Sequence, residues 1–180
     1  MSGRTRSFDD VHPQESCETL NTEDALVDMA LRAWKLHIDR TGKFFSGLSE
    51  EQLLHEIAPG RNRIFYLWGH LTAVNDALIP LLGFGERLHP ELDAMFISTP
   101  DRVLAQTLSG ADLKRIWEEI NDALWHSFSK LSATEWLDKH TSVSDEAFAR
   151  EPQRNRYTIL LSRTSHLAYH FGQAILTRGR

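Results

Sequence analysis

Residues 157–178 read YTILLSRTSHLAYHFGQAILTR, and this stretch decides the fold class of the chain. Its apolar side chains recur at intervals of three and four residues, as they do along one side of an amphipathic α-helix. The same spacing recurs over residues 22–45, 62–82 and 109–131. No segment alternates apolar and polar residues in the way a half-buried strand does. The sequence therefore predicts an all-α domain in which four long helices form a four-helix bundle.

Polar residues indicate where the long helices begin. Asn21 and Thr22 precede an acidic first turn, and Ser109 precedes the third long stretch. Gly83 is a natural stop for the second helix, provided that Pro80 is accommodated in its last turn. The apolar stripe of the first helix, expected to face the core, consists of Leu26, Met29, Ala30, Ala33, Trp34 and Leu36, with Phe44 and Phe45 at its end.

The long connections are expected to carry short extra helices. Residues 49–59 begin with a capping-box pattern and end at a Pro-Gly pair. Residues 99–108 begin with a Thr-Pro-Asp sequence that is typical of a helix start. Ser132 predicts one helical turn, and residues 83–98 read as loop. Residues 1–20 are polar and aperiodic, so they are predicted to form an arm outside the helical domain of residues 21–180.

Composition excludes several classes of function. The net charge of −5 and the lack of a dense Lys/Arg run argue against nucleic-acid binding. The chain has no apolar run of about 18 residues and no apolar leader, which argues against a membrane protein and against secretion. Its one cysteine, Cys17, cannot form an internal disulfide, which fits a reducing cytoplasm.

Three histidines are the candidate metal ligands. His166 and His170 lie four residues apart, hence one turn apart on one helix face, and His70 lies in the second long stretch. Imidazoles from two neighbouring helices would complete a three-histidine site with positions left for water or substrate. On ideal geometry His70 lies roughly 90°, His170 roughly 115° and His166 roughly 155° from the centre of its apolar stripe. Such positions suit a groove between helices, and they equally suit exposed histidines that bind nothing.

Other signatures of catalysis are absent or weak. The pair reads HLAYH, without the glutamate of the zincin proteases, and no P-loop, Gly-x-Ser-x-Gly elbow or dinucleotide fingerprint occurs. His37 on the first helix could approach the groove, but a surface or interface role is the simpler interpretation, and the other remaining histidines read as solvated side chains. Arg61, Arg63, Arg154 and Arg156 flank the starts of the second and fourth helices. They would bind an anionic substrate if those ends cluster, but solvated helix flanks are the simpler interpretation.

The residues Leu67-Trp68-Gly69-His70-Leu71 and His166-x-x-x-His170-Phe171-Gly172-Gln173, in this order, resemble the DinB/YfiT-like superfamily of metalloenzymes. The resemblance covers about residues 24–178. It implies a bundle of up-down-down-up connectivity in which His70, His166 and His170 hold a divalent transition metal. Zinc or nickel is favoured, with manganese or iron as alternatives. It also implies a homodimer.

The resulting expectation is a metal-dependent enzyme that acts on a small-molecule substrate. It would activate water as a hydrolase, or a thiol such as mycothiol, bacillithiol or glutathione as a thiol transferase. The long loop matches no thiol-binding signature, so the subgroup stays open. No catalytic base is assigned, and Tyr66 and Gln173 are the nearest candidates to shape the site. The alternatives are a non-catalytic metal-binding or stress-response bundle, in which the metal pins two helices together, and a metal-free dimerisation unit.

Overall fold

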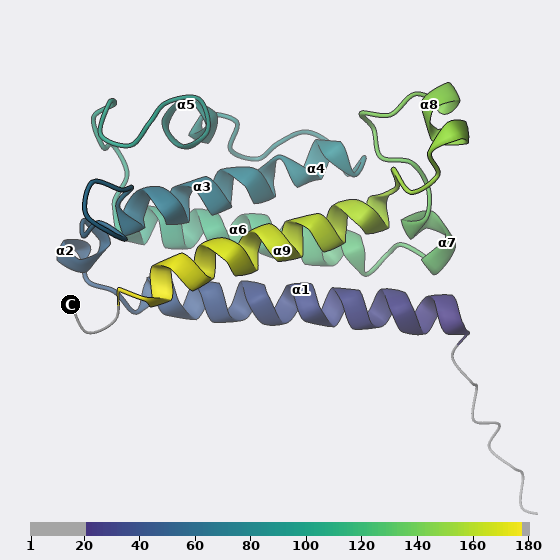
Figure 1. Cartoon of the computed structure of the whole chain (residues 1–180), viewed down its shortest axis with the longest axis horizontal. Helices are drawn as coiled ribbons and strands as arrows, with labels where there is room; N and C mark the ends of the chain where they lie inside the picture. Colours follow the sequence, from purple (N-terminus) through teal and green to yellow (C-terminus); the bar gives the residue numbers. More distant parts are fainter. Residues whose placement is uncertain (1–20, 178–180) are drawn as a thin grey trace, which may run out of the picture.

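The computed structural model describes residues 21–177, and these residues form helices joined by turns and loops (Figure 1). Two isolated bridges, Glu56–Arg63 and Lys139–Asn155, are the only strand-like pairings within that range. The all-α prediction is confirmed. The predicted arm at residues 1–20 lies outside the described residues. In chain order the helices are α1 (Thr22–Ser46), α2 (Glu50–Leu53), α3 (Ile64–Asp76), α4 (Leu78–Leu81), α5 (Leu92–Phe96), α6 (Gly110–Phe128), α7 (Ala133–Trp136), α8 (Asp145–Arg150) and α9 (Arg156–Ile175).

The four long helices α1, α3, α6 and α9 lie side by side (Figure 1). Helix α1 packs against both α6 and α9, and α3 packs against the same two helices from the other side. The colours of Figure 1 show that the chain runs in one direction along α1 and α9 and in the opposite direction along α3 and α6. These directions agree with the expected up-down-down-up order. None of the helices in residues 21–177 is long and apolar enough to cross a membrane.

Side-chain caps start α1 and α6 where the sequence indicates, whereas α3 begins after Arg63 without one. The Asn21 side chain accepts a hydrogen bond from the Glu23 amide at the start of α1. Ser109 and Asp112 form a reciprocal capping box at the start of α6. Ser49 and Ser132 begin α2 and α7 in the same manner. These bonds satisfy backbone donors that a helix start leaves free.

The first helix presents a different face to the core from the one expected. Leu26, Met29 and Leu36 are 51%, 66% and 47% exposed, Ala33 is exposed as well, and the stripe prediction is wrong for these four. The stripe failed because α1 carries apolar residues on two faces, and only one of these meets α6 and α9. The side chains buried there include Ala30, Trp34, Phe44 and Phe45 from the expected stripe, together with Val27, Ile38 and Thr41.

The connection between α3 and α6 also departs from expectation. The helix expected at residues 99–108 is absent, and residues 92–96, expected in a loop, form α5. Asp101, expected in the first turn of the absent helix, instead binds the Arg63 amide and guanidinium through its carboxylate. Arg102 has a φ of 73°, which a right-handed helix cannot include. The second long helix breaks after Asp76 and continues as the separate turn α4. Helix α8 was not expected either, and it has no buried residue that could signal it.

Candidate metal centre

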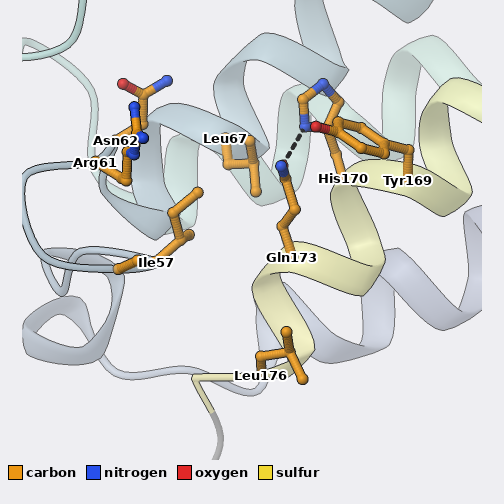
Figure 2. A pocket seen from close by; sticks show the side chains of 9 residues that line it. Ile57, Arg61, Asn62, Leu67, Tyr169, His170, Gln173 and Leu176 are labelled. Carbon is orange, nitrogen blue, oxygen red and sulfur yellow. Dashed lines mark hydrogen bonds between the residues drawn. The ribbon is translucent and has the colours of Figure 1, made fainter.

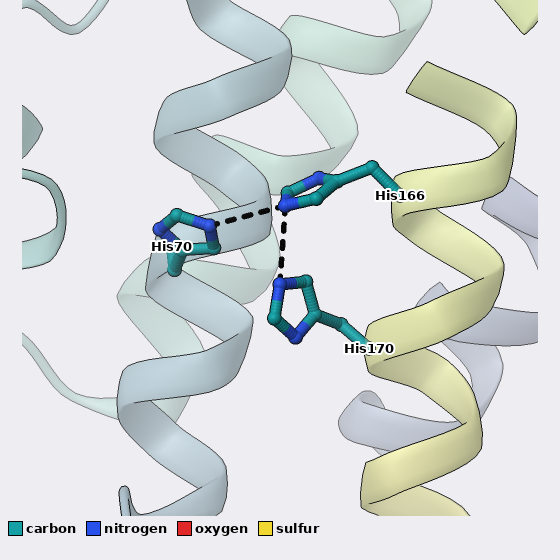
Figure 3. A group of neighbouring side chains, drawn as sticks. All are labelled: His70, His166 and His170. Carbon is teal, nitrogen blue, oxygen red and sulfur yellow. Dashed lines mark hydrogen bonds between the residues drawn. The ribbon is translucent and has the colours of Figure 1, made fainter. Parts of the chain in front are cut away.

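The three candidate ligands converge between α3 and α9 (Figure 3). His70 projects from α3, and His166 and His170 project from successive turns of α9. The Nε2 atom of His166 lies 3.4 Å from Nε2 of His70 and 3.1 Å from Nε2 of His170. All three donor atoms lie within 4.8 Å of one another. No other group of three potential ligands comes together in this way within residues 21–177.

Apolar packing places the histidines at this distance. Leu67 and Leu71 of α3 and Leu160 and Leu167 of α9 are all at most 2% exposed, and they belong to one core. The histidines lie beside this seam and are partly buried. Of the two readings that the helical angles left open, a groove between helices or exposed histidines, the structure shows the groove.

Two of the rings are held by hydrogen bonds on the side away from the centre. Nδ1 of His70 lies 3.0 Å from the carbonyl oxygen of Phe96. Nδ1 of His170 lies 2.8 Å from Oε1 of Gln173. A carbonyl oxygen can only accept, so each Nδ1 is the donor and each Nε2 keeps its lone pair. The same arrangement of an outer acceptor is found around metal-binding histidines generally.

The spacing of the nitrogens fits a metal ion. Zn²⁺ binds imidazole nitrogen at about 2.0–2.1 Å, which places two such ligands about 3.3 Å apart in a tetrahedron and about 3.0 Å apart at adjacent octahedral positions. The two separations that involve His166, 3.4 and 3.1 Å, lie in the range of these geometries, and the His70 and His170 donor atoms lie within 4.8 Å of each other. Three histidines would leave one position open in a tetrahedron and three in an octahedron. The donor set therefore suits zinc, nickel, manganese or iron and does not choose among them.

The surroundings of His166 and His170 lower their pKa values and so favour the neutral imidazoles that bind a cation. Burial lowers the pKa of His166 to about 4, and His170, His70 and Arg163 add to the effect. Burial also lowers the pKa of His170, although its bond to Gln173 opposes the shift. Both imidazoles are therefore neutral near pH 7, which is the form that ligates a metal.

A backbone acceptor that the sequence analysis did not identify depends on close packing at Gly69. A Cβ atom added to Gly69 would lie 2.2–2.4 Å from three ring atoms of Phe96. Glycine lets α5 approach α3, and this approach brings the Phe96 carbonyl to His70. The signal in the sequence is a glycine in the middle of a helix, directly before a candidate ligand. Tyr66 contributes indirectly: its hydroxyl donates to the Thr99 carbonyl, and its ring packs against Phe96.

An open pocket of about 630 Å³ adjoins the centre (Figure 2). His170 lines this pocket and also belongs to the histidine group. Tyr169 and Gln173 of α9 line the same side, and Arg61 and Asn62 project from the loop before α3 (Figure 2). Gln173, expected to shape the site, therefore contacts both the His170 ring and the pocket.

The arginines at the starts of α3 and α9 and the other histidines were also considered as site residues from the sequence. The starts of α3 and α9 lie at opposite ends of the bundle (Figure 1), so the four flanking arginines do not form the anion site considered from the sequence; Arg63 pairs with Asp101, Arg154 with Glu151, and Arg156 with Asp138. Arg61 has no ion-pair partner within residues 21–177. His37 stays outside the metal-binding group, as do the other described histidines, His55, His89, His126 and His140. His12 lies outside the described residues.

Comparisons with known proteins give the fold a precedent. No protein-family model matches the sequence, and no curated protein matches it. Among solved structures, the crystal structure of a conserved protein from Enterococcus faecalis superposes with a TM-score of 0.59 at 16% sequence identity. The match covers 85% of this chain and 95% of that one. A likeness at this identity shows a shared fold and carries no statement about activity.

Proposed function

We propose that this protein is a divalent-metal-dependent enzyme of the DinB/YfiT-like type, with His70, His166 and His170 as the metal ligands. The observation that carries the proposal is the convergence of three Nε2 atoms from two helices at separations that suit one ion. When bound, such a metal would supply a Lewis acid that lowers the pKa of a coordinated water or thiol. The chain's own residues would hold the metal, orient the rings and bind the substrate.

The lining of the pocket favours a thiol substrate over hydrolysis. Its residues include the polar side chains of Arg61, Asn62, Tyr169 and Gln173, and no aspartate or glutamate is among those described. Hydrolysis benefits from a side chain that accepts a proton from water, and a carboxylate most often does so when histidines are committed to a metal. A thiol ionises more easily and needs no such base. The proposed activity is therefore transfer of a low-molecular-weight thiol, with metal-dependent hydrolysis as the second candidate.

Elemental analysis of untagged protein tests the metal assignment. The wild type is expected to bind one equivalent of zinc or nickel, and His166→Ala is expected to lose it because two imidazoles are a weak site. His126→Ala is the matched control, since His126 is exposed near the end of α6 and belongs to no ligand group. Full retention of metal by His166→Ala would defeat the assignment. A screen of the metal-loaded protein with mycothiol, bacillithiol and glutathione then tests the thiol reaction.

A structural metal that pins α3 to α9 is the non-catalytic alternative. The buried leucines of α3 and α9 already hold these helices together, which reduces the need for such a pin. Thermal unfolding with and without chelator separates the two roles. A loss of a few degrees fits a catalytic metal in a preformed site, whereas unfolding on chelation would favour the structural role.

A further inference from the structure

The loop that carries Arg61 is fixed in place. The Gly60 amide donates to the Glu56 carboxylate, and Gly60 adopts a φ of 72° that favours glycine. The Arg61 amide donates to the Ala58 carbonyl, and the Ile57 amide donates to the Asn62 carbonyl. Arg102 binds Glu56 from outside the loop. The loop therefore presents Arg61 to the pocket at little cost in ordering when a ligand binds.

The positive charge of Arg61 is not balanced by a carboxylate in the described chain. Neighbouring cations are matched: Arg63 by Asp101 and Arg102 by Glu56. Arg61 lines the pocket, is exposed, and has no carboxylate partner in the described chain. Its planar fork is suited to bind a carboxylate through two hydrogen bonds.

The opposite side of the pocket reaches the histidine centre at one ligand, His170. His170 and Gln173 lie there, and the apolar side chains of Ile57, Leu67 and Leu176 also line the space (Figure 2). A ligand that fits this arrangement has an anionic group at one end, a short apolar stem, and a metal-binding atom at the other end. One guanidinium matches one negative charge, which favours a carboxylate over a doubly charged phosphate.

We infer that Arg61 is a specificity-determining residue, and that the enzyme selects a small carboxylate-bearing substrate whose reacting group lies at the histidine centre. This inference rests on the proposed function, because it requires a metal at His70, His166 and His170.

The test uses Co²⁺-loaded protein and two thiol probes, mercaptopropionate and mercaptohexanoate, each beside its neutral amide. Thiolate binding to Co²⁺ is followed by the sulfur-to-cobalt charge-transfer absorption. In wild type, at least one acid is expected to bind about five- to tenfold more tightly than its amide, which corresponds to one charge-assisted contact in an open pocket. The preference should shrink as salt concentration rises.

Variants test whether Arg61 causes the preference for the acid over its amide. Arg61→Gln should bind Co²⁺ and both amides as wild type does, but it should lose the preference for acids. Arg61→Lys should keep part of it, because charge remains and the fork is lost. Arg150→Gln is the matched control: it removes the same charge from α8, at the opposite end of the molecule (Figure 1), and should change nothing.

Each failure has a separate meaning. If Co²⁺ does not bind to wild type, the metal proposal falls, and this inference falls with it. If Co²⁺ binds but no acid is preferred over its amide, or if the preference survives in Arg61→Gln, only the assignment of Arg61 is overturned.

Discussion

Replacement of Gly69 by alanine is expected to destabilise the protein and weaken metal binding, although alanine is the better helix former. In an exposed helix interior the change would stabilise by about 1 kcal/mol. Here the new Cβ would meet three ring atoms of Phe96 at 2.2–2.4 Å. Phe96 is 1% exposed and packs against Phe65 and Tyr66 with ring centroids 5.9 Å away in each case, so the ring has little room to move.

The net loss of stability can be bounded. Overpacking of this kind costs about 1–3 kcal/mol or more, and three overlaps on a confined ring place Gly69→Ala at the upper end. After the gain in helix propensity is subtracted, the free energy of unfolding should fall by about 2 kcal/mol. For a chain of this size that lowers the melting temperature by about 4–8 °C.

Metal affinity should fall in the same variant. Movement of Phe96 takes its carbonyl oxygen away from Nδ1 of His70, and loss of an outer acceptor typically costs about 10- to 100-fold in metal affinity. Competition against a chelator of known affinity measures this change, and differential scanning fluorimetry of the metal-free protein measures stability.

Gly172→Ala is the matched control on the other helix. A Cβ added there meets no atom within 4 Å, so this variant should melt about 2–4 °C higher and bind metal as wild type does. If Gly69→Ala behaves like Gly172→Ala in both assays, the role given to Phe96 is refuted.

Four further predictions concern the centre and its surroundings. Gln173→Leu removes the acceptor for Nδ1 of His170, so it should weaken metal binding about tenfold in chelator competition while the melting temperature of the metal-free protein stays the same. Asp101→Ala leaves Arg63 without its partner and should cost about 2–3 kcal/mol in urea unfolding. Burial would raise the pKa of Asp101, but the bonds and charge of Arg63 outweigh it and lower the pKa, so the wild type should lose this contribution only below about pH 3.8. The free energy of unfolding of the metal-free protein should fall by about 1–2 kcal/mol between pH 6.5 and about 4, a figure discounted for the partial exposure of His166. The reason is that the unfolded chain protonates His166 at its ordinary pKa, whereas the folded chain keeps the ring neutral down to about pH 4. The melting temperature of His166→Phe should therefore depend less on pH over that range. The expected homodimer stays a prediction, and a monomer mass in sedimentation equilibrium at micromolar concentration would contradict it.

The long helices were predictable because their signals are local. Asn21 and Ser109 cap within three residues of themselves, so the sequence alone indicates where α1 and α6 begin. Burial on α1 was less predictable, because Leu26 and Val27 are both apolar and only the position of α6 and α9 decides between them. The prediction of a helix at residues 99–108 was wrong for a related reason. Thr99-Pro100-Asp101 has the local pattern of a helix start, but Asp101 binds Arg63, 38 residues away, which offers both a charge and a backbone donor.

In the histidine centre, too, the residues with local signals were predictable and a group placed by tertiary packing was not. Its three donor side chains could be predicted because the four-residue pair and His70 each lie on a helix whose apolar stripe is legible in the sequence. The groups that aim the rings differ in kind. Gln173 lies one turn from His170 and was identifiable, whereas the acceptor for His70 is the backbone carbonyl of Phe96. Every residue carries a carbonyl, so residue identity cannot single this one out. The one local signal is Gly69, because the absence of a side chain there allows α5 to approach α3. Substitution of Gly69 therefore tests whether the Phe96 carbonyl orients His70 for metal binding or whether the three histidines only lie close together.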